Sequence, residues 1–383
     1  MKHELYKGRE QARFKHELLE AYLERLFMIV GQHQRTICYV DCFAGPWQAK
    51  GDDLEDTSIA VSLNIIRKCR EGLLKINHKV HFKALFVERD RTAYAKLKEY
   101  LDNRDDEGVE THPLHGEFIQ LRQEILSRCD KDSFTFFFID PTGWKDVVEL
   151  ATLDPLLRRA NSEFLINFMY DFLVRTHTQE PFSSDMKRIF GRVPDTKGMT
   201  AKAKEEHLVR LYRENLKTVV PTRGGKPRTA CVQVKKVLLD RTLYHLVYLT
   251  RHPKGIIEFM AASDGLDLVQ KRLRALAKQE TQVESSGQLV LIAADESIKK
   301  EEGRADLSEV KLYWLTKLSS IPRRFGITEL ADMLEETDWF ASDFQKAFKE
   351  LDAEGKVKNQ DAKKARRVNA VNFEKGEMLV KLT

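Results

Sequence analysis

Acidic residues end several short apolar runs of this chain, at spacings that suggest one shared binding site. The first of these motifs consists of Asp41, Phe43, Ala44, Gly45 and Pro46. Its small residues allow backbone NH groups to approach a ligand, and its carboxylate can meet the positive end of that ligand. A loop cap is the alternative interpretation of Asp41.

Two further acids follow at strand-like positions. Glu88 ends the second apolar run, where a carboxylate can accept bidentate hydrogen bonds from both hydroxyls of a ribose. The alternative is a surface residue that pairs with Arg89 or Arg91. The run His-Gly-Glu-Phe at 115–118 offers the carboxylate of Glu117 to the amino group of an adenine. Ordinary loop chemistry explains this motif nearly as well.

The fourth motif begins with Asp140 and Pro141, directly after a very apolar run. A carboxylate that a following proline holds at a strand end can accept hydrogen bonds from an exocyclic amine. The nitrogen lone pair is then directed toward an electrophilic methyl group. Asp and Pro are also common in turns, so a plain turn is the alternative. The order and spacing of the four motifs favour a common function.

An open parallel sheet would bring these motifs together. Apolar runs at 36–43, 80–88, 133–139 and 164–168 predict buried strands, with helical patterns between them. Strands that alternate with helices form a parallel sheet covered on both faces, which binds ligands beyond the carboxyl ends of its strands. Two adjacent runs within 231–250 predict an antiparallel hairpin. The predicted fold class is therefore α/β and Rossmann-like, with a terminal antiparallel hairpin.

The motifs Asp-Cys-Phe-Ala-Gly-Pro, Val-Glu-Arg-Asp, His-Gly-Glu-Phe and Phe-Ile-Asp-Pro-Thr-Gly together resemble those of class I methyltransferases that use S-adenosylmethionine (SAM). With Lys15 and His16 in the opening helix, and with the C-terminal region considered below, the chain resembles more narrowly the three-Cys-motif partner protein family (TcmP). The resemblance covers most of the chain, and its sharpest motifs lie in the first 170 residues. It implies a seven-stranded methyltransferase sheet and a genomic association with a radical-SAM-like partner protein that carries three cysteines.

Carried over residue by residue, the resemblance implies that Glu88 contacts the ribose of SAM and that Glu117 contacts its adenine. Asp140 and Pro141 would face the transferred methyl group. The implied cofactor-binding residues are Lys15, Asp41, Phe43, Ala44, Gly45, Pro46, Glu88, Arg89, Glu117 and Phe118.

Two positions depart from the pattern of these methyltransferases. Trp47 stands where a second glycine is usual, and its bulk either closes the loop against SAM or points away. Thr142 and Gly143 stand where a proline and an aromatic residue usually follow the acidic residue and its proline. Trp144 is a catalytic candidate because it could supply the missing stacking surface, although a structural tryptophan is an equally good interpretation.

Positive charge is concentrated in one segment. Residues 187–254 contain 17 Lys or Arg against 5 Asp or Glu, an excess of 12, whereas the whole chain has a net charge of +5. Such a segment is either an ordinary solvated face or the footprint of a polyanion such as nucleic acid. Arg223, Lys226 and Arg228 lie in its Gly- and Pro-containing loop. We expect part of the segment to border the acceptor side of the pocket and its charge, including these three residues, to contact phosphates.

The end of the chain predicts a separate small domain. Helical patterns at 308–319, 327–336 and 341–354 precede two β-like pieces at about 356–358 and 367–373. Three helices followed by a small hairpin are typical of a winged helix. Basic side chains would crowd its wing, and we predict nucleic-acid contacts for Lys363, Lys364, Arg366 and Arg367.

The predicted organisation is a SAM-binding domain at 1–279, a connector at 280–307 and a winged-helix-like domain at 308–383. No run approaches the roughly 20 apolar residues that cross a bilayer, and the N-terminus lacks the apolar core of a secretory signal. We therefore expect a cytoplasmic protein with no membrane partner. The five cysteines form no CxxC pair, which argues against a disulfide framework and a metal site and predicts reduced core thiols.

Methyl transfer from SAM to a nucleic acid, for example to an exocyclic base nitrogen, is the function that these observations favour. One alternative is a regulatory or interaction protein that keeps the nucleotide pocket without turnover, which Trp47 and the incomplete amine motif favour. Another is a DNA-binding regulator with an N-terminal scaffold. Against it, residues 309–383 carry 14 basic and 13 acidic side chains, which is little excess charge for an autonomous DNA reader.

Overall fold

The chain divides into two compact units, residues 1–252 and 253–383. The computed structural model describes residues 10–45, 57–104, 108–141, 147–171, 183–236, 241–267, 271, 305–362 and 368–382. The predicted connector at 280–307 lies outside the described residues except for its last three. The predicted domain boundaries therefore stay a prediction.

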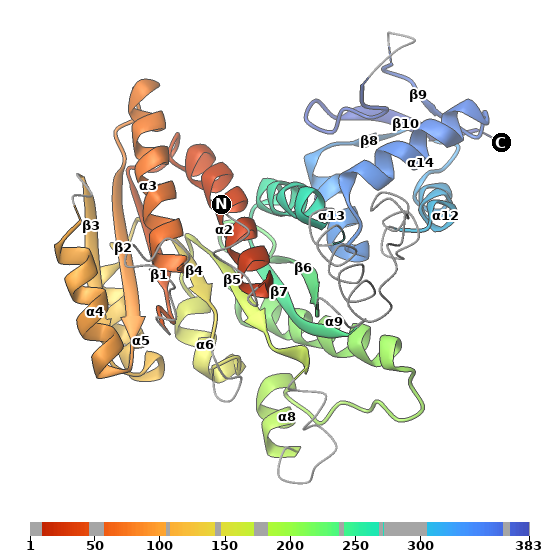
Figure 1. Ribbon diagram of the computed structural model, residues 1–383. Coiled ribbons are helices and arrows are strands. Elements are labelled where there is room, and N and C mark those ends of the chain that lie inside the picture. Colours follow the sequence, from red (N-terminus) through yellow and green to blue (C-terminus); the bar gives the residue numbers. More distant parts are fainter. Residues whose placement is uncertain are drawn as a thin grey trace, which may run out of the picture. The chain divides into compact units, whose positions relative to one another are not determined.

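The first unit is built around a seven-stranded sheet (Figure 1). Its strands are β1 (Thr36–Asp41), β2 (His81–Glu88), β3 (Val109–His115), β4 (Phe134–Ile139), β5 (Ser162–Phe168), β6 (Arg228–Lys235) and β7 (Thr242–Thr250). Their spatial order is β3-β2-β1-β4-β5-β7-β6, and neighbours from β3 to β5 are parallel. β7 runs antiparallel to both β5 and β6. This mostly parallel α/β sheet agrees with the predicted Rossmann-like class, and the antiparallel hairpin is confirmed.

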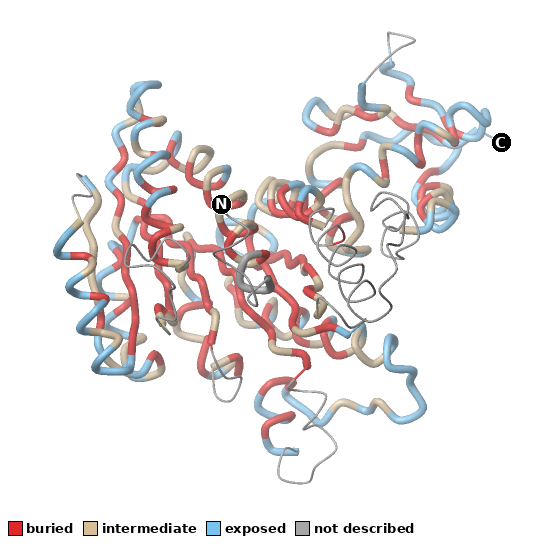
Figure 2. Tube along the Cα trace, viewed as in Figure 1, coloured by how far each residue is buried: buried red, intermediate tan, exposed pale blue. Residues whose placement is uncertain are grey.

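Continuous apolar sequence explains the central strands. Every residue of β4 and of β5 is buried, as expected for parallel strands that helices cover on both faces. Burial of the consecutive residues Phe136, Phe137 and Phe138 contributes several kcal/mol, since each such side chain is worth about 1.5–3 kcal/mol. Figure 2 shows this buried layer along the middle of the sheet.

Helices cover both faces of the sheet. They are α2 (Glu10–Val30), α3 (Ser58–Lys75), α4 (Arg91–Asp102), α5 (Phe118–Arg128), α6 (Leu150–Leu157), α8 (Ser183–Phe190) and α9 (Ala201–Val219). α2 and α3 pack together on one face, whereas α5, α6, α8 and α9 share a buried apolar cluster on the other (Figure 1). The side chains of Thr57 and Asp90 cap α3 and α4 by accepting hydrogen bonds from backbone NH groups.

The second unit contains a helix at residues 253–267 and a small three-stranded sheet. The elements that follow are α12 (Leu307–Lys317), β8 (Arg323–Phe325), α13 (Ile327–Thr337), α14 (Ala341–Ala353), β9 (Val357–Asn359) and β10 (Glu377–Lys381). β10 pairs antiparallel with both β8 and β9. The fully buried Trp314 anchors the core, and its indole NH donates to the carbonyl of Phe344 at 3.0 Å.

The three helices predicted for this unit are confirmed, but the strand predicted at 367–373 is wrong. Residues 368–373 form no strand, and the chain enters the sheet only at Glu377. Val371 is buried, yet its NH donates a hydrogen bond to the side-chain oxygen of Gln345 at 2.9 Å rather than to a neighbouring strand. The apolar residues at 368–373 therefore pack as part of a loop and not as a strand. None of the described helices is both long and apolar enough to cross a membrane.

Candidate functional site

Main-chain hydrogen bonds hold the carboxyl ends of the parallel strands together. They continue the pairing beyond the regular strands and place the loops after β1, β2 and β3 on one edge of the sheet. The bonds join Cys42 N to Phe138 O at 2.9 Å, Ala44 N to Val87 O at 2.8 Å, and Gly116 N to Glu88 O at 3.0 Å. The structure therefore brings the strand-end motifs to a common edge.

Asp41 is fully buried at the end of β1. Its Oδ1 accepts a hydrogen bond from the NH of Phe43 at 3.1 Å, and its Oδ2 accepts one from the hydroxyl of Ser58 at 2.8 Å. Burial raises the pKa of Asp41 to about 6, although these two hydrogen bonds act in the opposite direction. Asp41 thus fixes the loop after β1 and the start of α3, which is the loop-capping role that the sequence left open. The same carboxylate titrates close to neutral pH.

Gly45 lies directly against Glu88. The Glu88 side chain is mostly buried, and its Oε1 accepts a hydrogen bond from the NH of Asp90 at 2.7 Å. A Cβ at position 45 would lie 1.8 Å from Glu88 Oε2, so only glycine permits this approach. Within the described residues Glu88 makes no ion pair with Arg89, which instead lies 3.7 Å from Glu117. The first two motifs are therefore in contact.

Glu117 and Phe118 stand at the start of α5. Gly116, just before them, has a φ of +147°, a conformation that favours glycine. The Glu117 side chain is more than half exposed, and it is free to meet a ligand beyond the sheet edge. Phe118 is buried, and its ring lies 5.2 Å from the ring of Phe43. The Phe118 ring therefore packs against Phe43 in the loop after β1.

Asp140 is held by two partners after β4. Lys15 Nζ forms an ion pair with Oδ2, and the side-chain amide of Asn167 donates to Oδ1 at 2.7 Å. The side chains of Lys15 and Asp140 are each 16% exposed, so the pair is partly shielded from water. The predicted cofactor residue Lys15 thus neutralises Asp140. The sequence did not point to Asn167, although a polar residue within an apolar strand was a usable signal.

Two buried tyrosines, Tyr39 and Tyr244, are affected by the charges of Asp41 and Asp140. Burial, followed by the charge of Asp41, raises the pKa of Tyr39 well above its usual value. Burial and the charge of Asp140 raise the pKa of Tyr244. Asp41 and Asp140 also repel each other, whereas Lys15 attracts Asp41. Asp41 and Asp140 therefore give this edge of the sheet a negative potential, which Lys15 partly offsets, and the edge suits a ligand with positive charge and hydroxyl donors.

Several predicted residues have no described position. Pro46, Trp47, Thr142, Gly143, Trp144, Lys363, Lys364, Arg366 and Arg367 lie outside the described residues. Pro141 is described and is buried beside Asp140. The roles assigned to the undescribed residues stay predictions.

The loop of Arg223, Lys226 and Arg228 lies at the amino edge of the sheet, not at the carboxyl edge. Arg228 pairs with Thr250 at the start of β6, and β6 runs in the same direction as β1 to β5. Because a strand rises about 3.3 Å per residue, roughly 25 Å separate this loop from the far end of β6. This loop is therefore the part of the basic segment that lies away from the strand-end motifs. Arg223 and Lys226 are exposed, whereas Arg228 is buried, which does not fit a phosphate contact.

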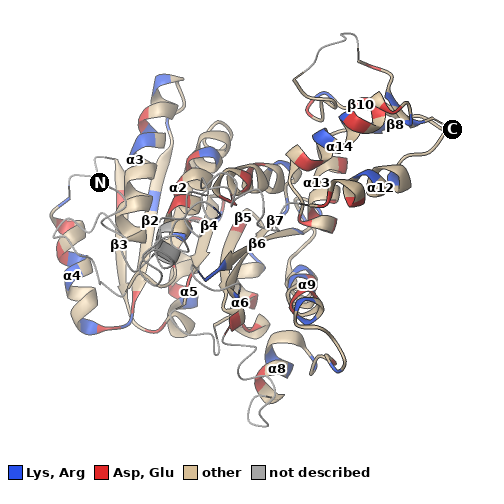
Figure 3. Cartoon of the chain, turned by 45° about the vertical axis from the view of Figure 1, so that its right-hand side comes forward, with Lys and Arg blue, Asp and Glu red and all other residues tan. Residues whose placement is uncertain are grey.

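Basic residues occur on α8, in the connection to α9 and along α9 (Figure 3), and several of those before and in the first turn of α9 are exposed. This stretch follows β5 in the chain and leads into the first turn of α9. Two large apolar side chains, Val193 and Met199, are 49% and 40% exposed within it. The exposed basic residues here are Lys187, Arg188, Arg192, Lys197 and Lys202, of which Arg188 forms ion pairs with Glu149 and Asp185.

Other basic residues of the segment serve the fold. The guanidinium of Arg213 donates to the carbonyl of Thr229 at 2.8 Å, and that of Arg251 donates to the carbonyl of Leu157 at 3.0 Å. Both arginines are buried. The excess charge of the segment therefore overstates the charge available to a partner.

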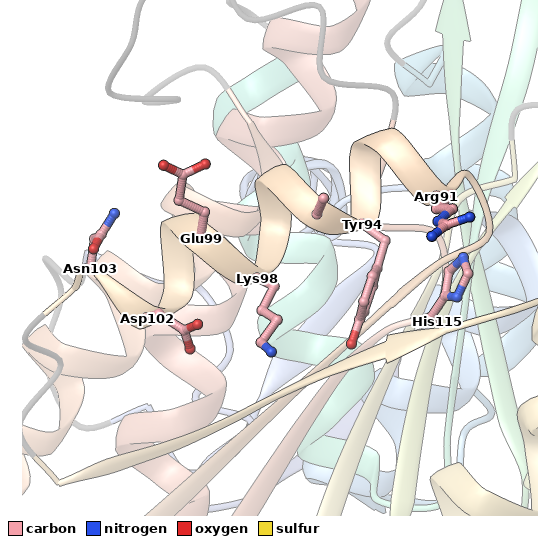
Figure 4. Close-up of a pocket in the computed structure, with 8 residues that line it drawn as sticks. Arg91, Tyr94, Lys98, Glu99, Asp102, Asn103 and His115 are labelled. Atoms are coloured by element: carbon pink, nitrogen blue, oxygen red, sulfur yellow. The ribbon is translucent and has the colours of Figure 1, made fainter.

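A groove with a volume of about 530 Å³ runs along α4 near the end of β3 (Figure 4). Within it the rings of Tyr94 and His115 stack with centroids 4.7 Å apart. Asp41, Glu88, Glu117 and Asp140 do not line it, but His115, the first residue of the third motif, does. Its lining residues are Arg91, Tyr94, Ala95, Lys98, Glu99, Asp102, Asn103 and His115. In the described part of the chain, no group of three or more His, Cys, Asp or Glu side chains is placed to hold a metal ion.

No protein-family model and no curated protein matches this chain. Among solved structures it is similar to protein LPL1258 from Legionella pneumophila, of family DUF519, with a TM-score of 0.37 and 11% identity over 66% of this chain and 91% of that chain. It is also similar to loganic acid methyltransferase with SAH, with a TM-score of 0.26 and 11% identity over 96% of this chain and 93% of that chain. Similarity at these scores carries no argument about function. Membership of the TcmP family stays a prediction.

Proposed function

We propose that residues 1–252 form a SAM-dependent methyltransferase. The observation that carries this proposal is the convergence of Asp41, Glu88, Glu117 and Asp140 on the carboxyl edge of one mostly parallel sheet. Ligands of open α/β sheets bind at this edge. The four acids come from separate strand ends, so their meeting is a property of the fold rather than of one local loop.

The residues at this edge fit SAM. Its amino and sulfonium groups are positive and suit the potential of Asp41 and Asp140, and its ribose hydroxyls suit Glu88, whose Oε2 lies beside the backbone of Gly45. The Glu117 side chain is exposed, and it would accept a hydrogen bond from the adenine amino group of the same SAM molecule. When bound, SAM supplies an electrophilic methyl group on a positively charged sulfur.

Asp140 would orient the methyl acceptor. Asn167 and Lys15 fix its carboxylate, and each carboxylate oxygen retains a lone pair for a further donor. An acceptor amine that donates one hydrogen to Asp140 presents its lone pair to the methyl carbon. When the nitrogen–carbon bond forms, the methyl–sulfur bond would break, the demethylated cofactor would leave as a neutral thioether, and the acceptor nitrogen would release a proton toward Asp140 or water.

Calorimetric titration with SAM and with its demethylated product tests the cofactor assignment. Glu88→Ala should weaken SAM binding about tenfold to a hundredfold, because hydrogen bonds to a charged group contribute about 1.5–3 kcal/mol. Glu99→Ala, an exposed acid in the groove along α4, is the matched control and should bind SAM as the parent does. Absence of SAM binding at millimolar concentration would refute the proposal, and equal binding by Glu88→Ala would remove Glu88 from the site.

We propose a nucleic acid as the methyl acceptor. The support is the set of exposed basic residues between α8 and α9, in the stretch that follows the carboxyl end of β5. A triple variant with Arg192, Lys197 and Lys202 changed to Ala should bind RNA or DNA more weakly and with a flatter salt dependence. Each lost phosphate contact removes nearly one unit of log–log slope.

The control for this test is a double variant with Arg223 and Lys226 changed to Ala, at the amino edge of the sheet. Its nucleic-acid binding should resemble that of the parent, and neither variant should alter SAM affinity. If the parent binds neither RNA nor DNA at low salt, or if the triple variant keeps the parent's slope, the acceptor is not a nucleic acid held by this stretch. A protein acceptor would then be the better proposal.

A second candidate function is SAM binding without turnover, as in a regulatory protein. The ion pair between Lys15 and Asp140 favours it, because Lys15 competes with an acceptor amine for the Asp140 carboxylate. Incubation with labelled SAM and pools of tRNA, rRNA, DNA and protein separates the two candidates. Label transfer to any pool supports the enzyme, and tight binding without transfer supports the regulator.

For residues 253–383 we propose a winged-helix module that binds a partner. The order helix, strand, helix, helix, strand, strand from α12 to β10 supports this assignment. A three-cysteine, radical-SAM-like protein as that partner rests on the family resemblance alone. Copurification of the two proteins from a shared host tests it.

A further inference from the structure

Two cysteines meet in the core of the first unit. Cys38 is the third residue of β1, and Cys129 directly follows α5. Their Sγ atoms are 3.2 Å apart, and both residues are at most 2% exposed. A disulfide has an S–S bond of about 2.05 Å, so the sulfurs need to approach by only about 1 Å to form one.

Positive charge surrounds this pair. The hydrogen bond from Cys38 lowers the pKa of the Cys129 thiol, and the charge of Arg159 lowers it further, against the opposing effect of burial. Arg159 is fixed there because its Nε donates to the hydroxyl of Thr135 at 2.9 Å. The charge of Lys83 acts on Cys38 in the same sense. These effects favour Cys129 over Cys38 as the sulfur that reacts as a thiolate, and either Sγ can donate the hydrogen bond between them.

Of the remaining cysteines, Cys42 is fully buried and senses the charge of Cys129, whereas Cys69 and Cys231 have different neighbours. Cys69 Sγ lies 3.7 Å from the carbonyl of Glu24, and Cys231 Sγ lies 3.6 Å from the guanidinium of Arg213. Cys38 and Cys129 are thus a specific pair, joined across 91 positions of the chain.

We propose that Cys38 and Cys129 form a reversible disulfide when the protein meets hydrogen peroxide. The Cys129 thiolate attacks one peroxide oxygen, the O–O bond breaks, and sulfenic acid and hydroxide result. The Cys38 sulfur then attacks the Cys129 sulfur, the S–S bond forms and the S–O bond breaks. The second hydroxide leaves with the proton of Cys38 as water. The two thiols lose two electrons, the peroxide becomes two waters, and a dithiol reductant reverses the reaction.

The crosslink would join two elements that carry the candidate site. Asp41 lies three residues beyond Cys38 on β1, and Glu117 and Phe118 stand at the other end of α5. The disulfide would also close a long loop of the unfolded chain, which stabilises the native state. This inference does not depend on the proposed methyl transfer.

The test uses the reduced full-length protein and one to ten equivalents of hydrogen peroxide under native conditions. The intact mass should fall by about 2 Da, free thiols should fall from five to three, and peptide mapping should link Cys38 to Cys129. Dithiothreitol should restore the starting mass, and the melting temperature of the oxidised form should rise by several degrees.

Cysteine variants test which residues form the disulfide. Cys69→Ala, a matched control at another buried cysteine, should still lose 2 Da, whereas Cys38→Ala and Cys129→Ala should not. If these variants do not fold, differential alkylation of the parent before and after peroxide gives the same information. Oxidation that links another pair, that yields only sulfinic or sulfonic acid, or that requires denaturant overturns the proposal.

Discussion

Gly45 is the residue whose change should disturb the site most directly. A Cβ there would lie 1.8 Å from Glu88 Oε2 and 3.0 Å from Glu88 Cδ, so Gly45→Ala must displace either the loop or the carboxylate. We expect SAM affinity to fall at least about tenfold, equivalent to about 1.4 kcal/mol, when it is measured by calorimetry.

Gly72→Ala is the matched control for this change. A Cβ at position 72 in α3 would lie 3.3 Å from the sulfur of Met28, the flexible part of a side chain that can move. Alanine in a helix is favoured over glycine by about 0.5–1 kcal/mol, so this variant should keep full affinity and unfold at the same or a higher temperature. Unchanged affinity in Gly45→Ala would show that the ligand does not use this loop.

Asp41 should make stability depend on pH in an uncommon direction. Its pKa in the native state is about 6, above its usual value of 3.8, so the native protein holds the proton that the unfolded chain has released between these values. The free energy of unfolding contributed by Asp41 is therefore highest below about pH 4 and is lost as the pH rises to 6. The total loss is about 3 kcal/mol, since each pKa unit corresponds to 1.36 kcal/mol.

Asp41→Asn removes this charge and keeps the acceptor for the NH of Phe43. Relative to the parent, the variant should gain stability progressively from pH 4 to pH 6 and keep that gain at pH 7. Urea unfolding at several pH values measures the difference, with the exposed Asp102→Asn as control. Parallel stability curves for the parent and Asp41→Asn would show that Asp41 ionises normally in the folded protein.

At the scale of elements, the ion pair of Lys15 and Asp140 ties α2 to the end of β4. The two side chains are each 16% exposed, so solvent screens them poorly. Lys15→Met should lower the free energy of unfolding by about 1.5–3 kcal/mol, because a charged hydrogen-bond partner is lost from a partly buried acid. Chemical denaturation at pH 7 measures this change.

Lys68→Met is the control, because Lys68 in α3 pairs with Glu24 in α2 at 2.7 Å but the two side chains are 66% and 40% exposed. Exposed pairs contribute little, typically less than about 1 kcal/mol. If both variants lose the same small amount, Lys15 does not hold α2 on the sheet edge.

Individual strands show which parts of the fold could be predicted from the sequence. Strands β1, β2, β4 and β5 were predictable because strands covered on both faces need continuous apolar sequence. β3 was not predicted, since it is an edge strand with partly exposed residues and the sequence Val-Glu-Thr-His-Pro-Leu-His. A proline such as Pro113 is tolerated at a sheet edge but removes the usual strand signal.

For the candidate site, acids at strand ends were visible in the sequence, but their partners were not. Lys15 and Asp140 are 125 positions apart in the chain, and only the tertiary fold joins them. Similarly, Arg228 counted as surface charge in the sequence, whereas the start of β6 buries it. The local sequence pattern predicts where the strands end, whereas tertiary packing decides which charged side chains are exposed to a binding partner.

At the scale of the whole molecule, the division into residues 1–252 and 253–383 predicts two independent folding units. Each has a core of its own, the first around β4 and β5 and the second around Trp314, whose ring lies 5.2 Å from that of Phe348 and 5.5 Å from that of Phe325. Chains of this size bury enough apolar surface to fold alone.

We therefore expect a fragment of residues 253–383 to unfold cooperatively on its own, because the buried Trp314 and its aromatic neighbours need no residue of the first unit. Its tryptophan fluorescence should shift to longer wavelength in a single urea transition, since Trp314 moves from the core into water. The fragment of residues 1–252 should bind SAM with the affinity of the full chain, because Asp41, Glu88, Glu117 and Asp140 all lie within it. A C-terminal fragment without a cooperative transition, or an N-terminal fragment that is folded but has lost SAM affinity, would show that the two units depend on each other.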